Sequence, residues 1–350
     1  MQNRVIGIAA AIVTAAFFCG GGCAPETGDD SAAAGGGEVV VYTALDRGFS
    51  EPILKEFEEE TGIKVRPKYD TEHTKTVGLV NSIRNEKSRP RCDVFWNNEI
   101  VNTIRLKRED CLAPYKPAAA EPYPQHFKDD DGYWHGFAGR ARVLLVNTDI
   151  VADDEMPDSI YDLLDPKWKG RIAIAKPLFG TTATHVACLF EHLGPEKAKK
   201  FLLDLKANDV QVEAGNKGVA TGVSSGKLAF GLTDTDDAII EVESGKPVKI
   251  VHPDGGPEQM GDLFIPNTLA VIKDCPNRKN AEKLVEYLLS PEVEARLARA
   301  ESAQIPLNPN VNEPTRVKTP KDVKALPIDF GKAAARWDAA AVFIKDHFLQ

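Results

Sequence analysis

Five acidic side chains stand directly after short segments that are expected to form strands. They are Asp46, Glu99, Asp234, Asp236 and Asp237. Because open α/β sheets hold ligands at the carboxyl ends of their strands, we expect these carboxylates to face one cleft. Converging anionic oxygens repel one another unless a cation lies between them. Hard oxygen ligands favour Fe³⁺, Ca²⁺, Mg²⁺ or Mn²⁺, and an organic ammonium would also satisfy them.

These acids have a second interpretation at helix starts. Asp234, Thr235, Asp236 and Asp237 precede the apolar run 238–240. An N-cap followed by acids in the first turn is ordinary helix-start chemistry. Asp46 fits both interpretations equally, and for Glu99 the helix start is favoured. The sequence therefore leaves ligand contact and capping open at these positions.

Two features supply positive charge for an anion. Arg140 and Arg142 alternate along one expected strand, so their side chains fall on the same face. A guanidinium presents a planar fork that suits carbonate, phosphate or carboxylate. Gly180, Thr181 and Thr182 open an expected helix, whose free backbone N–H groups and two hydroxyls form a natural anion site. Plain capping is the alternative for this turn.

Strands separated by helices position these residues. Strands are expected over 39–44, 64–69, 93–97, 142–147, 171–175, 210–213, 228–233, 248–252 and 263–273. Helices are expected over 49–61, 73–87, 99–109, 181–192, 195–207, 217–225, 236–244, 278–289, 292–300 and 332–348. This alternation predicts α/β units with mostly parallel sheets.

The N-terminal segment reads as an export signal. An uncharged run of 14 residues, Val5 to Phe18, follows Arg4, and glycines directly precede Cys23. The run is too short to span a bilayer, which takes roughly 20 residues, but suits a signal-peptide core. We expect a signal peptide over 1–22, lipidation at Cys23 and a flexible spacer over 23–37. Plain secretion is the alternative, and in both cases the protein works outside the cytoplasm, in the periplasm or at the cell surface.

Composition excludes several classes of function. The formal net charge of the 350 residues is -9, and no basic run is interleaved with aromatic residues, so nucleic acid is not an expected partner. The sequence contains no G-x-S-x-G, H-E-x-x-H or P-loop motif. We therefore expect no enzyme and no catalytic cofactor. An exported enzyme that uses paired carboxylates is the less favoured alternative.

Four cysteines follow the spacer, and no two of them have metal-ligand spacing. They are Cys92, Cys111, Cys188 and Cys275. An even number of cysteines in an exported protein permits disulfides, and Cys92 with Cys111 is the favoured pair. Free, buried cysteines are the alternative.

Six blocks of sequence, in this order, carry a family resemblance. They are VVVYTALDRGFSEPILKEFEEETGIKV, DVFWNNE, GRARVLLVNTD, DPKWKGRIAIAKP, GKLAFGLTDTDDA and NAEKLVEYLLSPEVEARLA. Together they resemble the extracellular solute-binding receptors of ABC importers, and most closely the ferric-ion-binding subfamily. The resemblance covers roughly residues 38 to 310. It implies an α/β fold of two lobes, joined by crossover hinge strands, with the ligand in the cleft between them.

The resemblance also implies domain boundaries. Residues 38–139 and 264–310 would form lobe 1, and residues 140–263 would form lobe 2. Residues 311–350 would pack back on the lobes. Closure of the lobes over the ligand would be driven by contacts available only in the closed state.

At the ligand positions this sequence departs from the family pattern. Ferric-binding members place a histidine after the first strand, a carboxylate after the DVF strand and two adjacent tyrosines after the GL strand. The histidine position holds Asp46, and the carboxylate position falls on Asn98 or its neighbour Glu99. The two tyrosine positions hold Asp236 and Asp237. No phenolate remains at that turn. The resemblance implies an arginine near a synergistic anion, here Arg140 or Arg142. Because the two share a face of their strand, one would line the cleft while the other ties the hinge.

The sequence thus predicts a monomeric solute-binding lipoprotein, not an enzyme, that delivers its ligand to an ABC permease. The predicted metal ligands are Asp46, Glu99, Asp236 and Asp237. The predicted ligand- or anion-binding residues are Arg140, Arg142, Thr181, Thr182, Asp234 and Thr235. The leading ligand is Fe³⁺ with a synergistic anion. The alternative is a zwitterion such as an aminophosphonate, whose amine would meet the carboxylates and whose anion would meet an arginine.

Overall fold

The structure is a computed structural model that describes residues 36–70 and 76–350. The expected signal peptide, Cys23 and all but the end of the spacer lie outside these residues. The first residues of the helix expected from residue 73 lie outside them too. Within the described ranges, no helix combines the length and apolar character that a membrane crossing requires.

Ten strands form the sheet in the described part of the chain, in the order β2-β1-β3-β10-β5-β8-β6-β7, with β4 beside β10 and β9 beside β5. They are β1 (Glu38–Thr43), β2 (Lys64–Tyr69), β3 (Val94–Asn97), β4 (Leu112–Ala113), β5 (His135–Asn147), β6 (Ile172–Ala175), β7 (Gln211–Glu213), β8 (Phe230–Asp234), β9 (Val248–Val251) and β10 (Phe264–Ile272). The pairs β1–β2, β1–β3, β6–β7 and β6–β8 are parallel.

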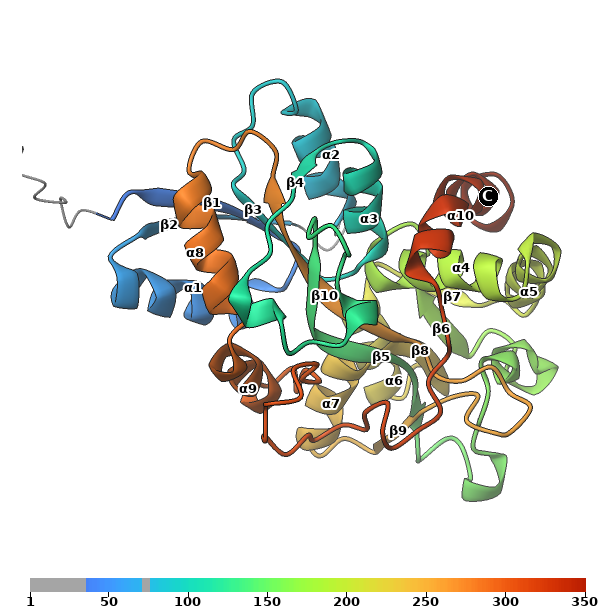
Figure 1. Cartoon of the computed structure of the whole chain (residues 1–350). Helices are drawn as coiled ribbons and strands as arrows, with labels where there is room; N and C mark the ends of the chain where they lie inside the picture. Colours follow the sequence, from blue (N-terminus) through green and yellow to red (C-terminus); the bar gives the residue numbers. More distant parts are fainter. Residues whose placement is uncertain (1–35, 71–75) are drawn as a thin grey trace, which may run out of the picture. The chain divides into compact units, whose positions relative to one another are not determined.

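The pairs formed by β5 and β10 are antiparallel, so the expectation of mostly parallel sheets is wrong for the middle of the molecule. All residues of β5 are buried. Its first half pairs with β10, and its second half pairs with β8 and β9. Figure 1 shows β5 and β10 side by side between the two groups of strands. We call β1–β4 with β10 the first sheet region and β6–β9 the second, with β5 shared by both.

The strand expected from residue 142 begins at His135, because residues 135–141 pair with β10. The sequence pattern that predicts a strand from residue 142 contains no signal for its extension back to His135. The shared strand β5, together with its long antiparallel partner β10, is the feature expected of hinge strands. The lobe boundaries 38–139, 140–263 and 264–310 remain a prediction.

The helices cover the sheet with apolar faces. They are α1 (Arg47–Thr61), α2 (Val77–Asn85), α3 (Val101–Arg108), α4 (Gly180–His192), α5 (Pro195–Ala207), α6 (Asn216–Ser224), α7 (Thr235–Glu243), α8 (Arg278–Leu288), α9 (Pro291–Arg299) and α10 (Phe330–Phe343). In α1, for example, Ile53, Leu54 and Phe57 are buried at helical spacing. The helix expected over 332–348 divides into α10 and a π-helical turn, Ile344–Phe348.

Two helices belong to more than one hydrophobic cluster. In α4, Ala187 packs in the cluster around β1 and β3, whereas Phe190 packs in a cluster of the second sheet region. In α10, Trp337 and Phe343 divide between the same two clusters. Figure 1 shows α10 lying along α4 close to α3, which it also contacts. These two helices therefore join the two sheet regions through buried apolar contacts.

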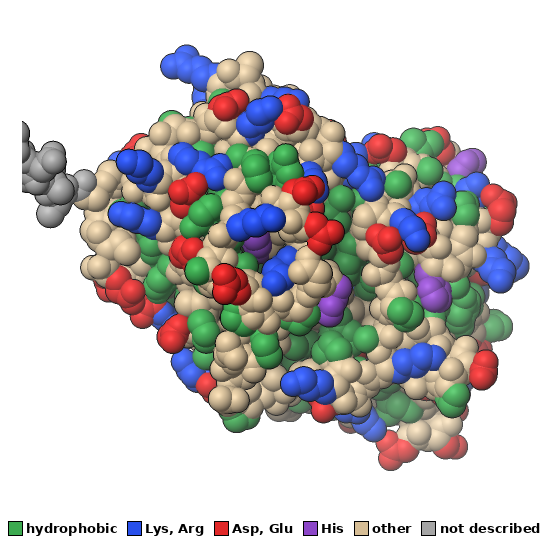
Figure 2. Space-filling view, viewed as in Figure 1, with side chains coloured by type: hydrophobic (Ala, Val, Ile, Leu, Met, Phe, Trp, Pro, Cys, Tyr) green, Lys and Arg blue, Asp and Glu red, His purple; other side chains and the backbone are tan. Residues whose placement is uncertain are grey.

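Surface charge contributes little to this architecture. Acidic and basic side chains are intermixed on the face of the molecule shown in Figure 2. Individual pairs at the surface, such as Arg47 with Glu51 at 2.9 Å, are largely solvated. Because exposed ion pairs contribute at most about 1 kcal/mol each, the buried clusters supply most of the stability.

The expected Cys92–Cys111 disulfide is wrong, since both thiols are free and buried. β10 runs between them: its Ile272 N–H donates to Asp93 O on one side, and the Lys273 N–H donates to Cys111 O on the other. Two strand spacings, roughly 9–10 Å, exceed the ~7 Å that a disulfide spans between Cα atoms. Cys188 and Cys275 are also free and buried, as the alternative interpretation expected.

Candidate functional site

A small pocket lies where the ends of β1, β3 and β8 meet the starts of α4 and α6. Its cavity of about 30 Å³ is the size of one or two water molecules. Of the residues predicted from the sequence, it is lined by Asp46, Arg140, Thr181, Thr182, Asp234, Asp236 and Asp237. Asn98, Lys176, Phe179 and Asn216 also line it. Glu99, Arg142 and Thr235 are not among its lining residues.

The first residues of α7 bring the acids together. Asp234 ends β8 and is the N-cap residue of α7, and Asp236 and Asp237 lie in the first turn of that helix. Ligand oxygens of these three carboxylates lie within 4.8 Å of one another, an arrangement that can hold a metal ion. Asp46 lines the pocket from the first sheet region, at the start of α1.

The capping interpretation applies only in part. The side chains of Asp46 and Asp234 make no capping hydrogen bond, although each occupies an N-cap position. Asp236 accepts a hydrogen bond from the Asp237 backbone N–H at 3.1 Å. The acids in the first turn of α7 also lie at the positive end of the helix dipole.

Arg142 is fully buried and held by side chains of β8, α4 and α6. Its Nη1 lies 2.5 Å from Asp234 Oδ1 and 3.0 Å from Asn216 Oδ1. The Thr181 hydroxyl and Asn216 Nδ2 donate to the other oxygen of Asp234, at 2.5 and 2.8 Å. Thr182 accepts from Nη2 at 3.2 Å. Both oxygens of Asp234 are thereby engaged in a closed network at the pocket wall.

His185, one turn further along α4, is in contact with this network. The Arg142 Nε–H donates to its Nδ1 at 3.5 Å, so His185 is the acceptor. Burial, together with the neighbouring guanidinium, lowers the pKa of His185 to about 3. The imidazole is therefore neutral at physiological pH.

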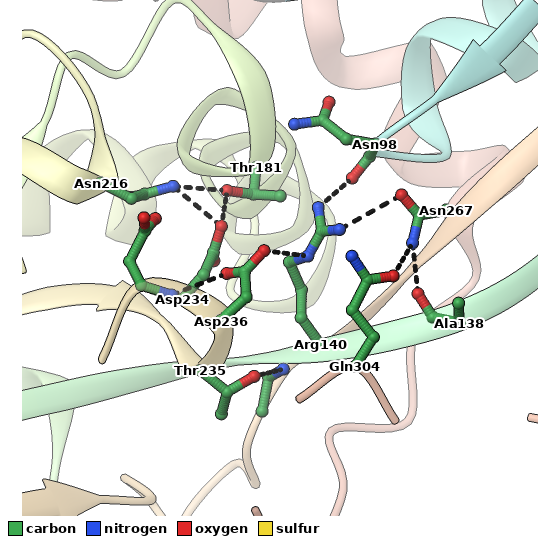
Figure 3. A network of polar contacts seen from close by, with 12 residues as sticks. Asn98, Ala138, Arg140, Thr181, Asn216, Asp234, Thr235, Asp236, Asn267 and Gln304 are labelled. Atoms are coloured by element: carbon green, nitrogen blue, oxygen red, sulfur yellow. Dashed lines mark hydrogen bonds and ion pairs between the residues drawn. The ribbon is translucent and has the colours of Figure 1, made fainter. Parts of the chain in front are cut away.

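Arg140 contacts three different segments at the pocket, as Figure 3 shows. Its Nη1 donates to the backbone oxygen of Asn98 at 2.7 Å, and its Nη2 donates to Asn267 Oδ1 at 3.2 Å. Its Nε lies 3.1 Å from Asp236 Oδ2. The last contact is an ion pair rather than an aligned hydrogen bond.

Glu99, one of the predicted metal ligands, lies at the start of α3, outside the pocket lining. Its oxygens accept from the Asn102 N–H at 3.1 and 3.2 Å, from Asn97 Nδ2 at 2.9 Å and from the Thr184 hydroxyl at 2.6 Å. Burial raises the pKa of this carboxyl. The helix-start interpretation describes Glu99, and its bond to Thr184 connects α3 with α4.

Thr235 also lies behind the pocket, because its hydroxyl accepts from the Ala141 N–H of β5 at 3.1 Å. Sequence reasoning missed Asn216, which holds Asp234 and contacts both threonines of α4. A signal for it was present, since Asn216 opens a helix directly after the strand β7. The sequence also left open whether Asn98 or Glu99 faces the cleft. The structure shows Asn98 in the pocket lining.

Two sheet regions joined by long antiparallel strands, with a polar pocket at the strand ends, define the class of two-lobe binding proteins. Solved structures agree with this class. Iron-bound HitA from Pseudomonas aeruginosa aligns with a TM-score of 0.79 at 23% identity, covering 87% of this chain and 98% of that one. AfuA from Actinobacillus pleuropneumoniae, with fructose-6-phosphate bound, aligns at 0.80 and 22% identity, covering 90% and 99%.

Sequence comparison identifies the family. The profile of the bacterial extracellular solute-binding proteins matches residues 102–334, and the chain belongs to this family. Iron uptake protein A1 of Synechocystis sp. (strain ATCC 27184 / PCC 6803 / Kazusa) is 28% identical over 287 residues, which cover 78% of each chain. The predicted resemblance to solute-binding receptors, and the two-lobe α/β fold that it implied, are confirmed.

Proposed function

We propose that this protein is the solute receptor of an ABC importer, that it captures ferric iron, and that it delivers the iron to a membrane permease. The observation that carries the proposal is the group of three carboxylates, Asp234, Asp236 and Asp237, in the pocket. Two similar proteins support the proposal, since one is named an iron uptake protein and the other, HitA, is iron-bound. Asp236 and Asp237 would bind the cation from the second sheet region, and Asp46 from the first.

The size of the pocket favours an ion over a larger ligand. A cavity of about 30 Å³ has room for an ion with little else, and a sugar phosphate or aminophosphonate would require a much wider opening. Carboxylate oxygens are hard ligands that suit Fe³⁺. The loss of both tyrosines from the family pattern would leave an all-carboxylate site, so we expect weaker iron binding than a phenolate site provides.

Anchoring and location belong to the same proposal. The receptor would be exported, lipidated at Cys23 and held at the membrane beside its permease as a monomer. Replacement of Cys23 by Ser should release the protein from the membrane fraction into the soluble exported fraction. Retention of the C23S variant in membranes would contradict the lipid anchor.

The acid pair of α7 provides the direct test of iron capture. The Asp236→Ala/Asp237→Ala variant should lose at least ~100-fold in Fe³⁺ affinity, about 2.7 kcal/mol, measured by titration in competition with citrate. Loss of their helix-dipole interaction should cost about 1–2 kcal/mol of stability, and loss of the ion pair between Asp236 and the buried Arg140 adds to that cost. The Glu241→Ala/Glu243→Ala variant removes two charges from α7 outside the pocket lining and is the matched control.

Full iron affinity in the α7 acid variant, with only lower thermal stability, would contradict the proposal. Tighter binding of an aminophosphonate than of Fe³⁺ by the unaltered protein would favour the zwitterion receptor instead. That receptor would use Arg140 as its principal anchor, so its affinity would survive the double substitution.

A further inference from the structure

We propose that Asp236 is a built-in counter-anion for Arg140, so that the site takes its cation without an anion from solution. The inference deepens the proposed function, on which its cation part rests. The pairing of Asp236 with Arg140 can be tested without any metal. It departs from the sequence-based expectation of a synergistic anion at Arg140 or Arg142.

The guanidinium of Arg140 is engaged at all three nitrogens. Nη1 meets Asn98 O at 2.7 Å, Nη2 meets Asn267 Oδ1 at 3.2 Å, and Nε meets Asp236 Oδ2 at 3.1 Å. The side chain of Arg140 is only 1% exposed, and that of Asp236 is 13% exposed. A dissolved anion would therefore have to displace Asp236 before it could reach this cation.

A buried polar chain keeps the Arg140 guanidinium in place. Asn267 on β10 accepts from Arg140 and donates through Nδ2 to Gln304 Oε1 at 2.9 Å and to Ala138 O. Figure 3 shows this chain on the side of the guanidinium opposite Asp236. Because Asn267 is fixed by two acceptors, its Oδ1 is oriented toward Arg140. Swinging Arg140 out toward a distant anion would break these contacts.

Asp236 stands between the cation of Arg140 and the expected place of the metal. One of its oxygens pairs with Arg140, and its other oxygen accepts from the Asp237 N–H at 3.1 Å. Its carboxylate also belongs to the group whose ligand oxygens lie within 4.8 Å of one another. One carboxylate can thus neutralise the arginine and contribute to the metal site. This is the arrangement that a bridging anion from solution would otherwise supply.

The second predicted anion site is neutralised in the same manner. Arg142 is fully buried and pairs with Asp234 at 2.5 Å. Each arginine thus pairs with its own aspartate. The two arginines are two residues apart on β5, and the two aspartates are two residues apart at the start of α7. A partner held in place by the fold acts at an effective concentration above the millimolar range of flexible tethers. Dissolved carbonate or phosphate at millimolar levels would compete poorly with it.

Phosphate titration of the metal-stripped full-length protein tests the pairing. Calorimetry should detect no saturable phosphate binding by the unaltered protein up to about 10 mM. Asp236→Asn removes the counter-charge with little change of shape and leaves a buried cation unpaired. This variant should therefore gain a phosphate site at least tenfold tighter than the limit of about 10 mM set for the unaltered protein. Adding Arg140→Met to Asp236→Asn should abolish the gain.

Asp237→Asn is the matched control, since it removes the same charge from the same helical turn and keeps the Arg140–Asp236 pair. It should gain no comparable phosphate site. Thermal unfolding of each variant verifies that it is folded. A phosphate site of equal affinity in the unaltered protein and the Asp236→Asn variant would overturn the proposal, as would a gain in Asp237→Asn equal to that in Asp236→Asn.

Iron titration with and without carbonate completes the test. The Fe³⁺ affinity of the unaltered protein should change less than threefold on addition of carbonate, whereas that of Asp236→Asn should depend on it. A tenfold or larger dependence in the unaltered protein would overturn the built-in anion. Failure of the unaltered protein to bind iron in either buffer would instead overturn the proposed function, and the phosphate comparison would decide the pairing alone.

Discussion

Arg140 and Arg142 are the same residue type, two positions apart on one strand, yet their surroundings differ. The side-chain partners of Arg142 come from β8, α4 and α6, all in or beside the second sheet region. Arg140 instead contacts Asn98 after β3, Asn267 on β10 and Asp236 on α7. A relative movement of the two sheet regions would leave the contacts of Arg142 intact but change those of Arg140. We infer that Arg142 stabilises the fold, while Arg140 responds to the state of the pocket.

Replacing each arginine by Met provides the largest expected contrast. Arg142→Met leaves Asp234 buried without its cation and should lower the free energy of unfolding by about 3–5 kcal/mol. Arg140→Met leaves the partly exposed Asp236, which the pocket can hydrate, and should cost about 1–3 kcal/mol. Urea unfolding of both variants measures the two losses. Equal losses would mean that the two arginines have the same structural role.

The pH dependence of the free energy of unfolding tests the Arg142 network through its neighbour His185. The folded-state pKa of His185, about 3, lies below its ordinary value of 6.5 because of burial and the charge of Arg142. Folding therefore favours the neutral imidazole, and its contribution is present above pH 6.5 and is lost as the pH falls toward 3. From pH 7 to pH 5 the loss should be about 2 kcal/mol.

The His185→Gln variant, measured by urea unfolding at both pH values, should lack this component of the pH dependence. Other groups also titrate in this interval, so the difference between the variant and the unaltered protein is the relevant quantity. Parallel stability curves for the two proteins would show that His185 does not sense the Arg142 network.

The smallest expected effect concerns Glu99. Because its carboxylate accepts from the Asn102 N–H in the first turn of α3 and lies outside the pocket lining, Glu99→Gln should change the Fe³⁺ affinity by no more than about twofold, or roughly 0.4 kcal/mol. The citrate competition titration described above measures it. A loss comparable with that of the Asp236→Ala/Asp237→Ala variant would support Glu99 as a metal ligand.

Much of the fold followed from periodicity, because alternating and helical patterns act over a few residues. The helix α5, for example, is expected over 195–207 and observed as Pro195–Ala207. The start of β5 could not be predicted in this way, since residues 135–141 become a strand only by pairing with β10, more than a hundred residues away. The cysteine pairing failed for a related reason, because the strand between Cys92 and Cys111 comes much later in the chain.

The site was predicted as a set of residues but not as a set of contacts. Residue type and position after strands were enough to gather Asp46, Asp236 and Asp237 near Arg140. Alternation along β5 placed Arg140 and Arg142 on one face, but only the three-dimensional arrangement shows which arginine lines the pocket. Similarly, the hydrogen bond from Thr184 to Glu99 depends on the packing of α4 against α3.

The burial of α4 has a consequence for mutational tolerance. Every residue from Gly180 to Phe190 is buried, and the helix packs into clusters on two sides. Most helices have an exposed face on which substitutions accumulate at little cost, but α4 has none before Glu191. A saturation mutagenesis library should therefore be depleted along nearly the whole helix. The turn that lines the pocket would be protected from sequence drift by its packing as well as by its ligand.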